Sequence, residues 1–386
     1  KFMTVVNKTG LKIAVMGAGL IGRRHIEQIV REANLHSIVD PTDAARELSE
    51  QYGRPWFASL ESLLSADKPD GIVIATPTGM HVENGLVCVS AGIPILIEKP
   101  IANNLDEGEK LVSLAAKKNI PVLVGHHRRH NPIMQQAKQL IDEGAIGKIV
   151  SVNAICWLYK PDDYYDVAWR RQKGAGPVLT NLIHDVDLLR CLCGEITEVH
   201  SVLSSKTRGH DVEDSAAIAL RFQSGALGTM SVSDTIVAPW SWELTSGENP
   251  AYPITNQSAY YIGGTKGSLQ FPNLKHWYNK KERSWWKEIF HKDKSTRSSR
   301  YTLVNQIDHL SDVVKGKAKP KINGNDGLVS LKIFDAILKK SIFIPVFSDN
   351  AVDTVGAGDA YFAITSIFIK HINDLETIGF VYSNIG

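Results

Sequence analysis

Lys99 is the residue whose position most suggests chemistry. It lies in the sequence Glu98-Lys99-Pro100, directly after the apolar run 94–97. This run predicts a strand, and an open parallel sheet binds its ligands at the carboxyl ends of its strands. Partial burial beside a bound ligand would tune the pKa of the ammonium group, so that Lys99 could exchange a proton with a substrate hydroxyl or carbonyl group. An exposed lysine that pairs with Glu98 is the alternative interpretation.

A glycine-rich loop predicts the dinucleotide site itself. Residues 17–22 read Gly-Ala-Gly-Leu-Ile-Gly and match G-x-G-x-x-G between an apolar run and a helical pattern. Gly17 would permit a tight turn, Gly19 would let the backbone approach a pyrophosphate, and Gly22 would let helix and strand pack closely. The free N–H groups at the start of the helix, where Leu20 and Ile21 lie, would bind the phosphates. A turn that serves packing alone is the alternative.

An acidic residue supports the dinucleotide interpretation independently. Asp40 follows the second predicted strand, 23 residues after Gly17, close to the spacing of about 20 in dinucleotide-binding folds. A carboxylate there accepts hydrogen bonds from the adenine ribose and repels a 2′-phosphate, which favours NAD over NADP. Arg23 and Arg24 could hold a phosphate, but they lie inside the first predicted helix.

The first 125 residues alternate strands and helices. Apolar runs predict strands over 11–16, 35–39, 71–75, 94–97 and 121–125, and helical spacing predicts helices over 20–33, 41–52, 80–91 and 105–118. Strands that alternate with helices of about ten or more residues imply crossover connections and a parallel sheet covered on both faces. The predicted fold class is therefore α/β, with a doubly wound NAD-binding domain over 1–125.

The pattern changes after about residue 126. Alternating stretches over 149–157, 216–222 and 226–233 predict antiparallel strands, and helices are predicted over 133–143, 178–193 and 301–314. These elements predict an α+β domain for substrate binding and oligomerisation over 126–341. The polar and basic stretch 280–300 is predicted to be an exposed or mobile loop rather than a phosphate site.

Composition and charge exclude several classes of protein. Hydrophobic residues make up 43% and charged residues 22% of the 386, which excludes wholesale disorder. The net charge of +2 provides no general attraction to nucleic acid or to an anionic membrane. No apolar run reaches the ~18 residues that span a bilayer, and residues 1–10 lack the apolar core of a signal peptide, so we expect a cytoplasmic protein. The four cysteines are expected to be buried thiols.

Five motifs together resemble the Gfo/Idh/MocA oxidoreductases, a family that includes glucose-fructose oxidoreductase and inositol dehydrogenase. They are the glycine loop, Ala75-Thr76-Pro77, Glu98-Lys99-Pro100, residues 125–132 (Gly-His-His-Arg-Arg-His-Asn-Pro), and Gly174-Ala175-Gly176-Pro177 leading to His184-Asp185-Val186-Asp187. Their order and spacing are similar to those of the family from about residue 10 to 340. The resemblance implies a Rossmann domain, a second domain whose open sheet often mediates oligomers, and oxidation or reduction of a sugar, a polyol or a related hydroxy compound.

The resemblance also implies roles for individual residues. It makes Lys99 and His184 catalytic, although a histidine that only structures its helix is the alternative for His184. Further cofactor contacts are expected from Thr76, Pro77, His81 and Glu98. The family often has an aspartate four residues before this histidine, where this chain has Thr180. Because Thr180 cannot act as a general base, Asn181 is expected to hydrogen-bond the substrate while Lys99 and His184 share the proton transfer.

Aromatic and cationic residues are expected around the substrate. Aromatic rings stack on the C–H faces of sugars, and cations bind hydroxyl or carboxylate groups. The expected substrate-binding residues are Lys99, Arg128, Lys160, Trp169, Arg170, Asn181 and His184. An aromatic core with cations at its edge is the alternative for this region. No metal is expected at the histidines around His126, because the resemblance implies none.

The leading hypothesis is an NAD-dependent dehydrogenase that transfers a hydride between the nicotinamide and a carbinol or carbonyl carbon. The alternatives are a non-catalytic, sugar-responsive NAD-binding regulator and a glycosidase of the same fold that uses NAD transiently. Thr180 keeps the regulator as an open alternative, whereas Lys99 and His184 argue against it, because a sensor needs neither. The expected partners are a sugar-like small molecule and further copies of the chain, in a homodimer or homotetramer, with no nucleic acid and no membrane.

A motif near the end of the chain stands apart from these. Residues 352–363, which include Gly356-Ala357-Gly358-Asp359, resemble the C-terminal signature of ribokinase-type (pfkB) sugar kinases. In those enzymes the glycines open a helix around the transferring phosphate, and the aspartate deprotonates the acceptor hydroxyl. The segment 342–386 is too short to supply a kinase sheet, lid and nucleotide pocket. It is therefore expected to be a joined fragment without kinase activity.

Overall fold

A six-stranded parallel sheet forms the first domain of the computed structural model, which describes residues 10–293 and 302–339. Its strand order is β3-β2-β1-β4-β5-β6. The strands are β1 (Lys12–Met16), β2 (Asn34–Val39), β3 (Trp56–Phe57), β4 (Gly71–Ile74), β5 (Ile95–Ile97) and β6 (Val122–Val124). The strand order reverses between β1 and β4, and open sheets bind their ligands at such a switch point.

Helices connect these strands and confirm the predicted doubly wound domain. They are α1 (Leu20–Glu32), α2 (Asp43–Tyr52), α3 (Leu60–Ala66), α4 (His81–Ser90) and α5 (Leu105–Lys118). Sequence periodicity predicts all of them except α3, and all the strands except β3. The strand β3 has only two residues, and α3 begins at a capping box in which Ser59 and Ser62 exchange hydrogen bonds. A serine in place of the usual Glu or Gln obscures this start signal.

The second domain contains an eight-stranded sheet with the order β14-β13-β12-β11-β7-β10-β9-β8. Its strands are β7 (Ile149–Trp157), β8 (Ile196–Ser204), β9 (Ser215–Phe222), β10 (Leu227–Ser233), β11 (Tyr260–Gly264), β12 (Gly267–Phe271), β13 (Lys275–Tyr278) and β14 (Phe290–Asp293). The predicted, largely antiparallel sheet is confirmed with one correction, since β7 and β10 pair in parallel. Alternation of side chains indicates which face they occupy, not the direction of the neighbouring strand.

The strand β14 corrects the interpretation of the basic stretch 280–300 as a loop. Its residues pair with β13 in antiparallel register, Phe290 opposite Tyr278 and Asp293 opposite Lys275. Four residues with charges at their end carry too little periodicity to predict a strand. Residues 294–300 of this stretch lie outside the described residues, as does the whole kinase-like segment 342–386.

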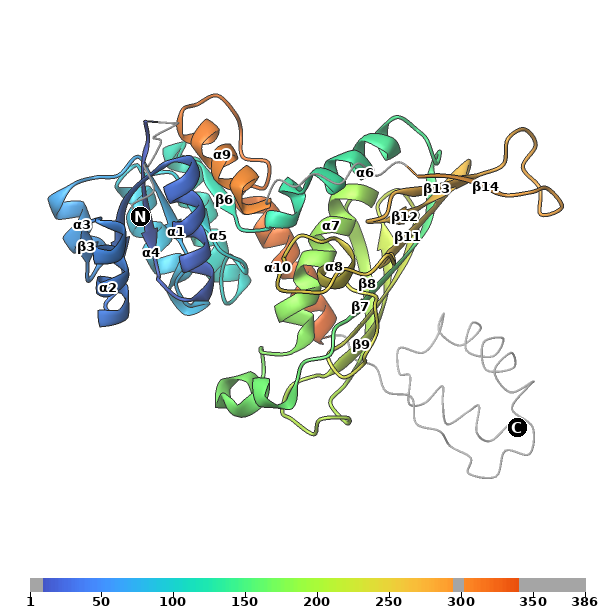
Figure 1. The fold of residues 1–386 in the computed structure, drawn as a ribbon, viewed down its shortest axis with the longest axis horizontal. Helices are drawn as coiled ribbons and strands as arrows, with labels where there is room; N and C mark the ends of the chain where they lie inside the picture. The colour runs from blue at the N-terminus through green and yellow to red at the C-terminus, as the bar shows by residue number, and fades with distance from the viewer. Residues whose placement is uncertain (1–9, 294–301, 340–386) are drawn as a thin grey trace, which may run out of the picture. The chain divides into compact units, whose positions relative to one another are not determined.

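Helices cover one face of the second sheet (Figure 1). They are α6 (Pro132–Asp142), α7 (Ile183–Cys193), the short α8 (Trp242–Thr245) and α10 (Gly324–Lys339), and a π-helical turn (Val178–Leu182) leads into α7. The helix α9 (Thr302–Val314), predicted as part of the 126–341 domain, packs instead with α1 in the first domain. Its residues Ile307 and Leu310 share a buried cluster with Ile26 and Ile29 of α1.

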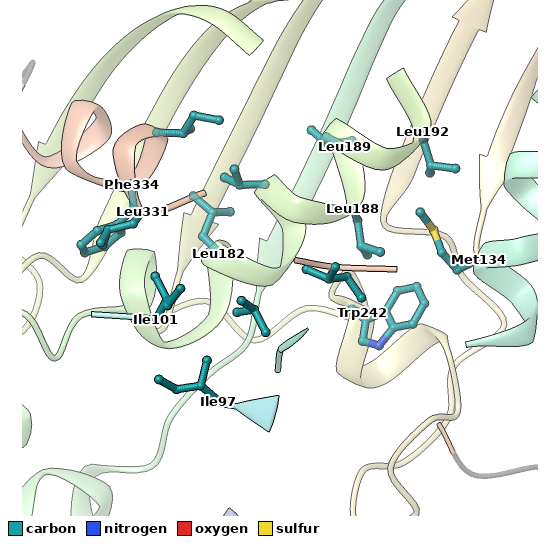
Figure 2. Close-up of a cluster of buried hydrophobic side chains, with 14 of the residues drawn as sticks. Ile97, Ile101, Met134, Leu182, Leu188, Leu189, Leu192, Trp242, Leu331 and Phe334 are labelled. Atoms are coloured by element: carbon teal, nitrogen blue, oxygen red, sulfur yellow. The ribbon is translucent and has the colours of Figure 1, made fainter. Parts of the chain in front are cut away.

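A second buried cluster joins the two domains. Figure 2 shows Ile97 and Ile101, which flank Lys99, in this cluster with Leu182 of the π-helical turn and Phe334 of α10. Burial of apolar surface stabilises a fold by roughly 25 cal/mol per Å². The cluster therefore holds the segment that carries Lys99 against the turn that precedes α7. Among the described residues, none of the helices is both long and apolar enough to cross a membrane.

Candidate active site

A cavity of about 640 Å³ is lined by residues from both domains. Its walls include the start of α1, the loops after β4 and β5, the segment after β7 and the π-helical turn. The predicted cofactor-binding residues that line it are Leu20, Ile21, Thr76, Pro77, His81 and Glu98. The predicted catalytic and substrate-binding residues that line it are Lys99, Arg128, Lys160, Asn181 and His184. The cavity thus lies where an open α/β sheet binds its ligands.

The glycine loop has the geometry that a dinucleotide site needs. Gly17 has a φ of +91°, and a Cβ atom there would lie 2.6 Å from the backbone of Ala75. A Cβ atom on Gly22 would lie 1.9 Å from the carbonyl oxygen of Gly17, so packing requires both glycines. Gly19 differs, because a Cβ atom there would meet no described atom within 4 Å. Since α1 also starts without a side-chain cap, this open helix start fits a pyrophosphate.

Asp40 is held as an anion beside this loop. Its carboxylate accepts hydrogen bonds from the backbone N–H of Ala18 at 2.8 Å and from the N–H and hydroxyl of Thr42 at 2.9 and 2.6 Å. Burial raises the pKa of Asp40, but the hydrogen bonds from Thr42 and Ala18 outweigh burial and hold the pKa below its usual value. A fixed carboxylate after the second strand suits a ribose diol. The residues present therefore fit NAD.

His81 braces the two loops that follow β4 and β5. Its Nδ1 lies 2.8 Å from the carbonyl oxygen of Pro100, and its Nε2 lies 2.9 Å from that of Thr76. The side chain is buried, and burial lowers its pKa. Because both ring nitrogens face backbone carbonyls, the structure gives His81 a positioning contact with Thr76. The hydroxyl of Thr76 is buried without a hydrogen-bond partner among the described residues, which makes it the stronger candidate for a ligand contact.

Glu98 is already paired within the protein. Its Oε1 lies 2.7 Å from Nε2 of the buried His25 on α1. Burial raises the pKa of Glu98, but the hydrogen bond with His25 and the charges of His127 and Lys99 lower it to about 2. The sequence predicts a cofactor contact here, and the structure adds that this anion ties the end of β5 to α1.

Lys99 reaches across the domain boundary. Its Nζ donates a hydrogen bond of 3.3 Å to the backbone carbonyl of Thr180 in the π-helical turn. Burial lowers the pKa of Lys99, Glu98 raises it, and the charge of Arg128 lowers it further, so that the pKa lies below its usual value. The ammonium group therefore contacts the second domain instead of pairing with Glu98. A lysine with a lowered pKa can accept a proton from a substrate.

His184 is a buried, neutral imidazole. Its ring makes edge contacts with His126 and His127, at centroid distances of 5.9 and 4.9 Å. Burial, followed by the charges of Lys99 and Arg128, places the pKa of His184 well below its usual value. Its Nδ1 is buried without a hydrogen-bond partner among the described residues. Despite this gathering of histidines, no group of three or more His, Cys, Asp or Glu side chains in the described chain could hold a metal ion.

Thr180 stands at the centre of a polar network. The buried Lys160 donates from Nζ to the Thr180 hydroxyl at 3.0 Å. That hydroxyl lies 2.9 Å from the carbonyl oxygen of Gly176 and 3.0 Å from Oδ1 of Asn181, either of which can accept its hydrogen. Thr180 thus connects Lys99, Lys160 and Asn181. These contacts depend on a π-helical turn, a distortion that is frequent at functional sites.

Arg128 is a buried cation whose partners are protein carboxylates. It donates to Glu243 at 2.7 Å and forms an ion pair of 3.3 Å with Asp185, and its guanidinium lies 5.4 Å from the ring centroid of Trp242. Burial lowers the pKa of Arg128, but the charges of Glu243 and Asp185 raise it beyond its usual value. Arg128 therefore fixes α8 against the turn after β6 while it lines the cavity.

The structure does not bring Trp169 and Arg170 to the cavity wall. Trp169 is 55% exposed. Arg170 stacks on Tyr164, with its guanidinium carbon 4.2 Å from the ring centroid, and donates to the backbone carbonyl of the same residue. Tyr164 lines the cavity, so Arg170 contacts the cavity wall through Tyr164.

Glu248, Tyr252 and Thr302 are among the lining residues that the sequence did not identify. Glu248 lies 2.9 Å from Nε2 of His127 and accepts hydrogen bonds from Asn131 at 2.8 Å and from Thr302 at 3.0 Å. Burial raises the pKa of Glu248, but the charge and hydrogen bond of His127, the charge of Arg128 and the hydrogen bond from Asn131 lower it to about 2. These residues lie outside any recognisable motif, so only their positions in space identify them.

The first domain, with its glycine loop and Asp40, defines a Rossmann-type dinucleotide-binding protein. Models of two family domains match the two parts of the chain: the oxidoreductase family with an NAD-binding Rossmann fold over residues 11–126, and the GFO/IDH/MocA C-terminal domain over residues 134–270. Together the two matches cover more than half of the chain. The chain belongs to the GFO/IDH/MocA family of NAD-binding oxidoreductases, as its motifs predict.

Several dehydrogenases are similar to this chain. Levoglucosan dehydrogenase of Pseudarthrobacter phenanthrenivorans is 28% identical, over 68% of this chain and 73% of its own length. Myo-inositol 2-dehydrogenase of Thermotoga maritima is 25% identical, over 86% of this chain and 96% of its own. The solved structure of the WlbA dehydrogenase from Bordetella pertussis, in complex with NADH and UDP-GlcNAcA, has a TM-score of 0.68 and 24% identity, and the match covers 87% and 99% of the two chains. It has the same fold.

Proposed function

We propose that the chain is a dehydrogenase that transfers a hydride between NAD and a carbinol or carbonyl carbon of a sugar, a polyol or a sugar acid. The observation that carries the proposal is the presence of Lys99 and His184 in one cavity that also borders the start of α1. The two curated relatives, named for levoglucosan and myo-inositol, support a sugar-like substrate. NADH formation from such compounds, dependent on Lys99, tests the proposal.

Each residue of the cavity has a distinct role in this proposal. Bound NAD supplies the hydride acceptor or donor. Lys99 Nζ takes the proton of the substrate hydroxyl during oxidation and returns it during reduction. The neutral His184 hydrogen-bonds the same hydroxyl and can relay that proton, because a neutral imidazole both donates and accepts. Asn181 orients a second polar group of the substrate, and the hydrophobic cluster around Ile97 keeps Lys99 in place.

The pH dependence of oxidation is expected to report on Lys99. Proton acceptance requires the neutral amine, so the rate should rise with pH through the pKa of Lys99 and level off above it. Because burial and the charge of Arg128 lower that pKa, the plateau should begin below the usual pKa of a lysine. Initial rates of NADH formation between neutral and alkaline pH provide the measurement. A rate that keeps rising in proportion to hydroxide, with no plateau, contradicts a lysine of lowered pKa.

Replacing Asp40 by alanine is expected to shift cofactor preference from NAD towards NADP. The change removes the carboxylate that would bind the ribose diol and repel a 2′-phosphate, so the ratio of the two dissociation constants should change by about tenfold or more, the size of one charge-assisted hydrogen bond. Titrations with NAD and NADP measure it. Asp43→Ala, in the exposed first turn of α2, is the control, and an equal shift in that variant would contradict the role of Asp40.

Three further expectations remain proposals. They are assembly into a homodimer or homotetramer, a cytoplasmic location, and the origin of the segment 342–386 as a joined fragment without kinase activity. Support for the first comes from the second domain, where alternating exposed residues along β9 and β10 leave one face of the sheet accessible. A sheet face of this kind can pair with the same face of a second copy.

A further inference from the structure

The carboxylates that line the cavity differ from its two lysines in their partners. Each carboxylate has a close cationic or imidazole partner: Glu98 with His25 at 2.7 Å, Glu243 with Arg128 at 2.7 Å, and Glu248 with His127 at 2.9 Å. The two lysines differ from these. Lys160 Nζ donates to the hydroxyl of Thr180, and Lys99 Nζ donates to the backbone carbonyl of the same residue. Two ammonium groups therefore converge on one residue that carries no charge.

The carboxylate nearest to Lys160 is shared with other groups. Asp234 lies 3.8 Å from Lys160 Nζ. The same carboxylate accepts a hydrogen bond of 2.9 Å from Nε of Arg208 and another from the hydroxyl of Tyr165. Asp234 is thus largely occupied by Arg208 and Tyr165, and at 3.8 Å from Lys160 Nζ it can still help to hold the ammonium group in position. Among the described residues, no carboxylate forms an ion pair with Lys99 Nζ.

Two cations close together in a partly dehydrated site repel each other and favour a counter-ion. The charge of Lys160 is one of the causes that lower the pKa of Lys99, after burial and Arg128. An anion that bound beside both lysines would replace this repulsion by charge-assisted hydrogen bonds. Lys99, Lys160 and Asn181 all line the same cavity, so a ligand that enters it can reach all three.

We propose that the substrate brings this anion, and that the carboxylate group of a sugar acid binds Lys160 Nζ beside Thr180 and Asn181. The inference rests on the proposed dehydrogenase function and narrows its substrate to hydroxy acids. Lys160, which lies 3.8 Å from Asp234, is the specificity-determining cation. Lys99 then remains available to exchange a proton with a hydroxyl group of the same molecule.

Equilibrium binding to the full chain in complex with NADH tests the inference, with NADH fluorescence as the signal. The probes are two matched pairs, D-gluconate with D-glucitol and D-glucuronate with D-glucose, which differ in each pair by the carboxylate. We expect at least one acid to bind about tenfold or more tightly than its neutral partner. Lys160→Met should abolish this preference. Lys173→Met, which removes the same charge from an exposed position, controls for long-range attraction.

A second test adds a negative charge at Thr180 instead of removing the positive charge of Lys160. Thr180→Asp would place a carboxylate against both lysines and should remove the preference for acids. Thr180→Asn has nearly the same size without the charge, so the difference between the two variants isolates the effect of charge. The NADH affinity and thermal midpoint of each variant show whether it is folded.

The inference is overturned if no acid binds more tightly than its neutral partner, or if Lys160→Met or folded Thr180→Asp keeps the preference of the wild type. Different results contradict the inference and the proposed dehydrogenase function. NADH formation from a neutral polyol without any preference for acids contradicts the inference alone. A preference for acids without NADH formation from any compound contradicts the dehydrogenase function alone.

Discussion

Replacing Lys99 by methionine is expected to lower kcat by about 10²- to 10⁴-fold, the usual contribution of a positioned proton-transfer group. Lys99 Nζ lies at the junction of the two domains, bonded to Thr180, and its lowered pKa makes the neutral amine accessible. Methionine keeps the length and apolar stem of the side chain, so the cluster around Ile97 should remain intact. Steady-state NADH formation measures the loss, and an NAD titration should show an unchanged dissociation constant.

Two controls separate a catalytic lysine from a structural one. Lys138→Met removes a lysine that pairs with Asp142 on the surface of α6 and should leave kcat unchanged. Nucleophilic or basic small amines supplied in solution should restore part of the activity of Lys99→Met, because they can take the same proton. If Lys99→Met lowers both kcat and the thermal midpoint, and small amines restore no activity, then Lys99 is needed for folding and not for proton transfer.

Alanine substitutions at Gly19 and Gly22 are expected to have opposite consequences for stability and for NAD binding. Gly22→Ala would bring its Cβ atom to 1.9 Å from the carbonyl oxygen of Gly17, so the loop must shift and the free energy of unfolding should fall by about 1–3 kcal/mol. Gly19→Ala meets no described atom within 4 Å and should leave that free energy within about 0.5 kcal/mol of the wild type. Urea unfolding without NAD measures both.

The same pair of variants locates the dinucleotide. If the pyrophosphate approaches the backbone at Gly19, a methyl group there should weaken NAD binding by about tenfold or more, even though the protein is as stable as the wild type. Binding of NAD to Gly19→Ala with unchanged affinity would place the cofactor elsewhere. Gly53→Ala is not a suitable control, because Gly53 has a φ of +60° and would add backbone strain.

The elements of the first domain could be predicted because local and tertiary preferences agree there. The side chain of Asn104 caps the start of the helix α5, and the predicted range 105–118 equals the observed one. The glycine loop and Asp40 carry chemistry in consecutive residues, so their roles follow from spacing alone. Pairing direction is different, because the parallel contact of β7 with β10 joins segments that are far apart in the sequence.

The polar residues of the site were only partly predictable. Sequence motifs predict Lys99 and His184 as site residues, but they do not indicate that Glu98 pairs with His25. Arg170 has the right residue type and a nearby position, yet it stacks on Tyr164 and is not among the residues that line the cavity. Such differences arise from the direction in which a side chain leaves an irregular loop, for which the sequence contains no periodicity.

The measurement that tests the central claim most directly is the stoichiometry of hydride transfer. The full chain, incubated with NAD and a panel of sugars, polyols and sugar acids, should form one NADH for each molecule of ketone or aldehyde product, and a substrate with deuterium on the reacting carbon should give deuterated NADH. Tight NAD binding without NADH formation from any member of the panel would contradict a dehydrogenase and favour a regulator. Cleavage of the substrate without net NADH formation would also contradict a dehydrogenase and would favour a glycosidase.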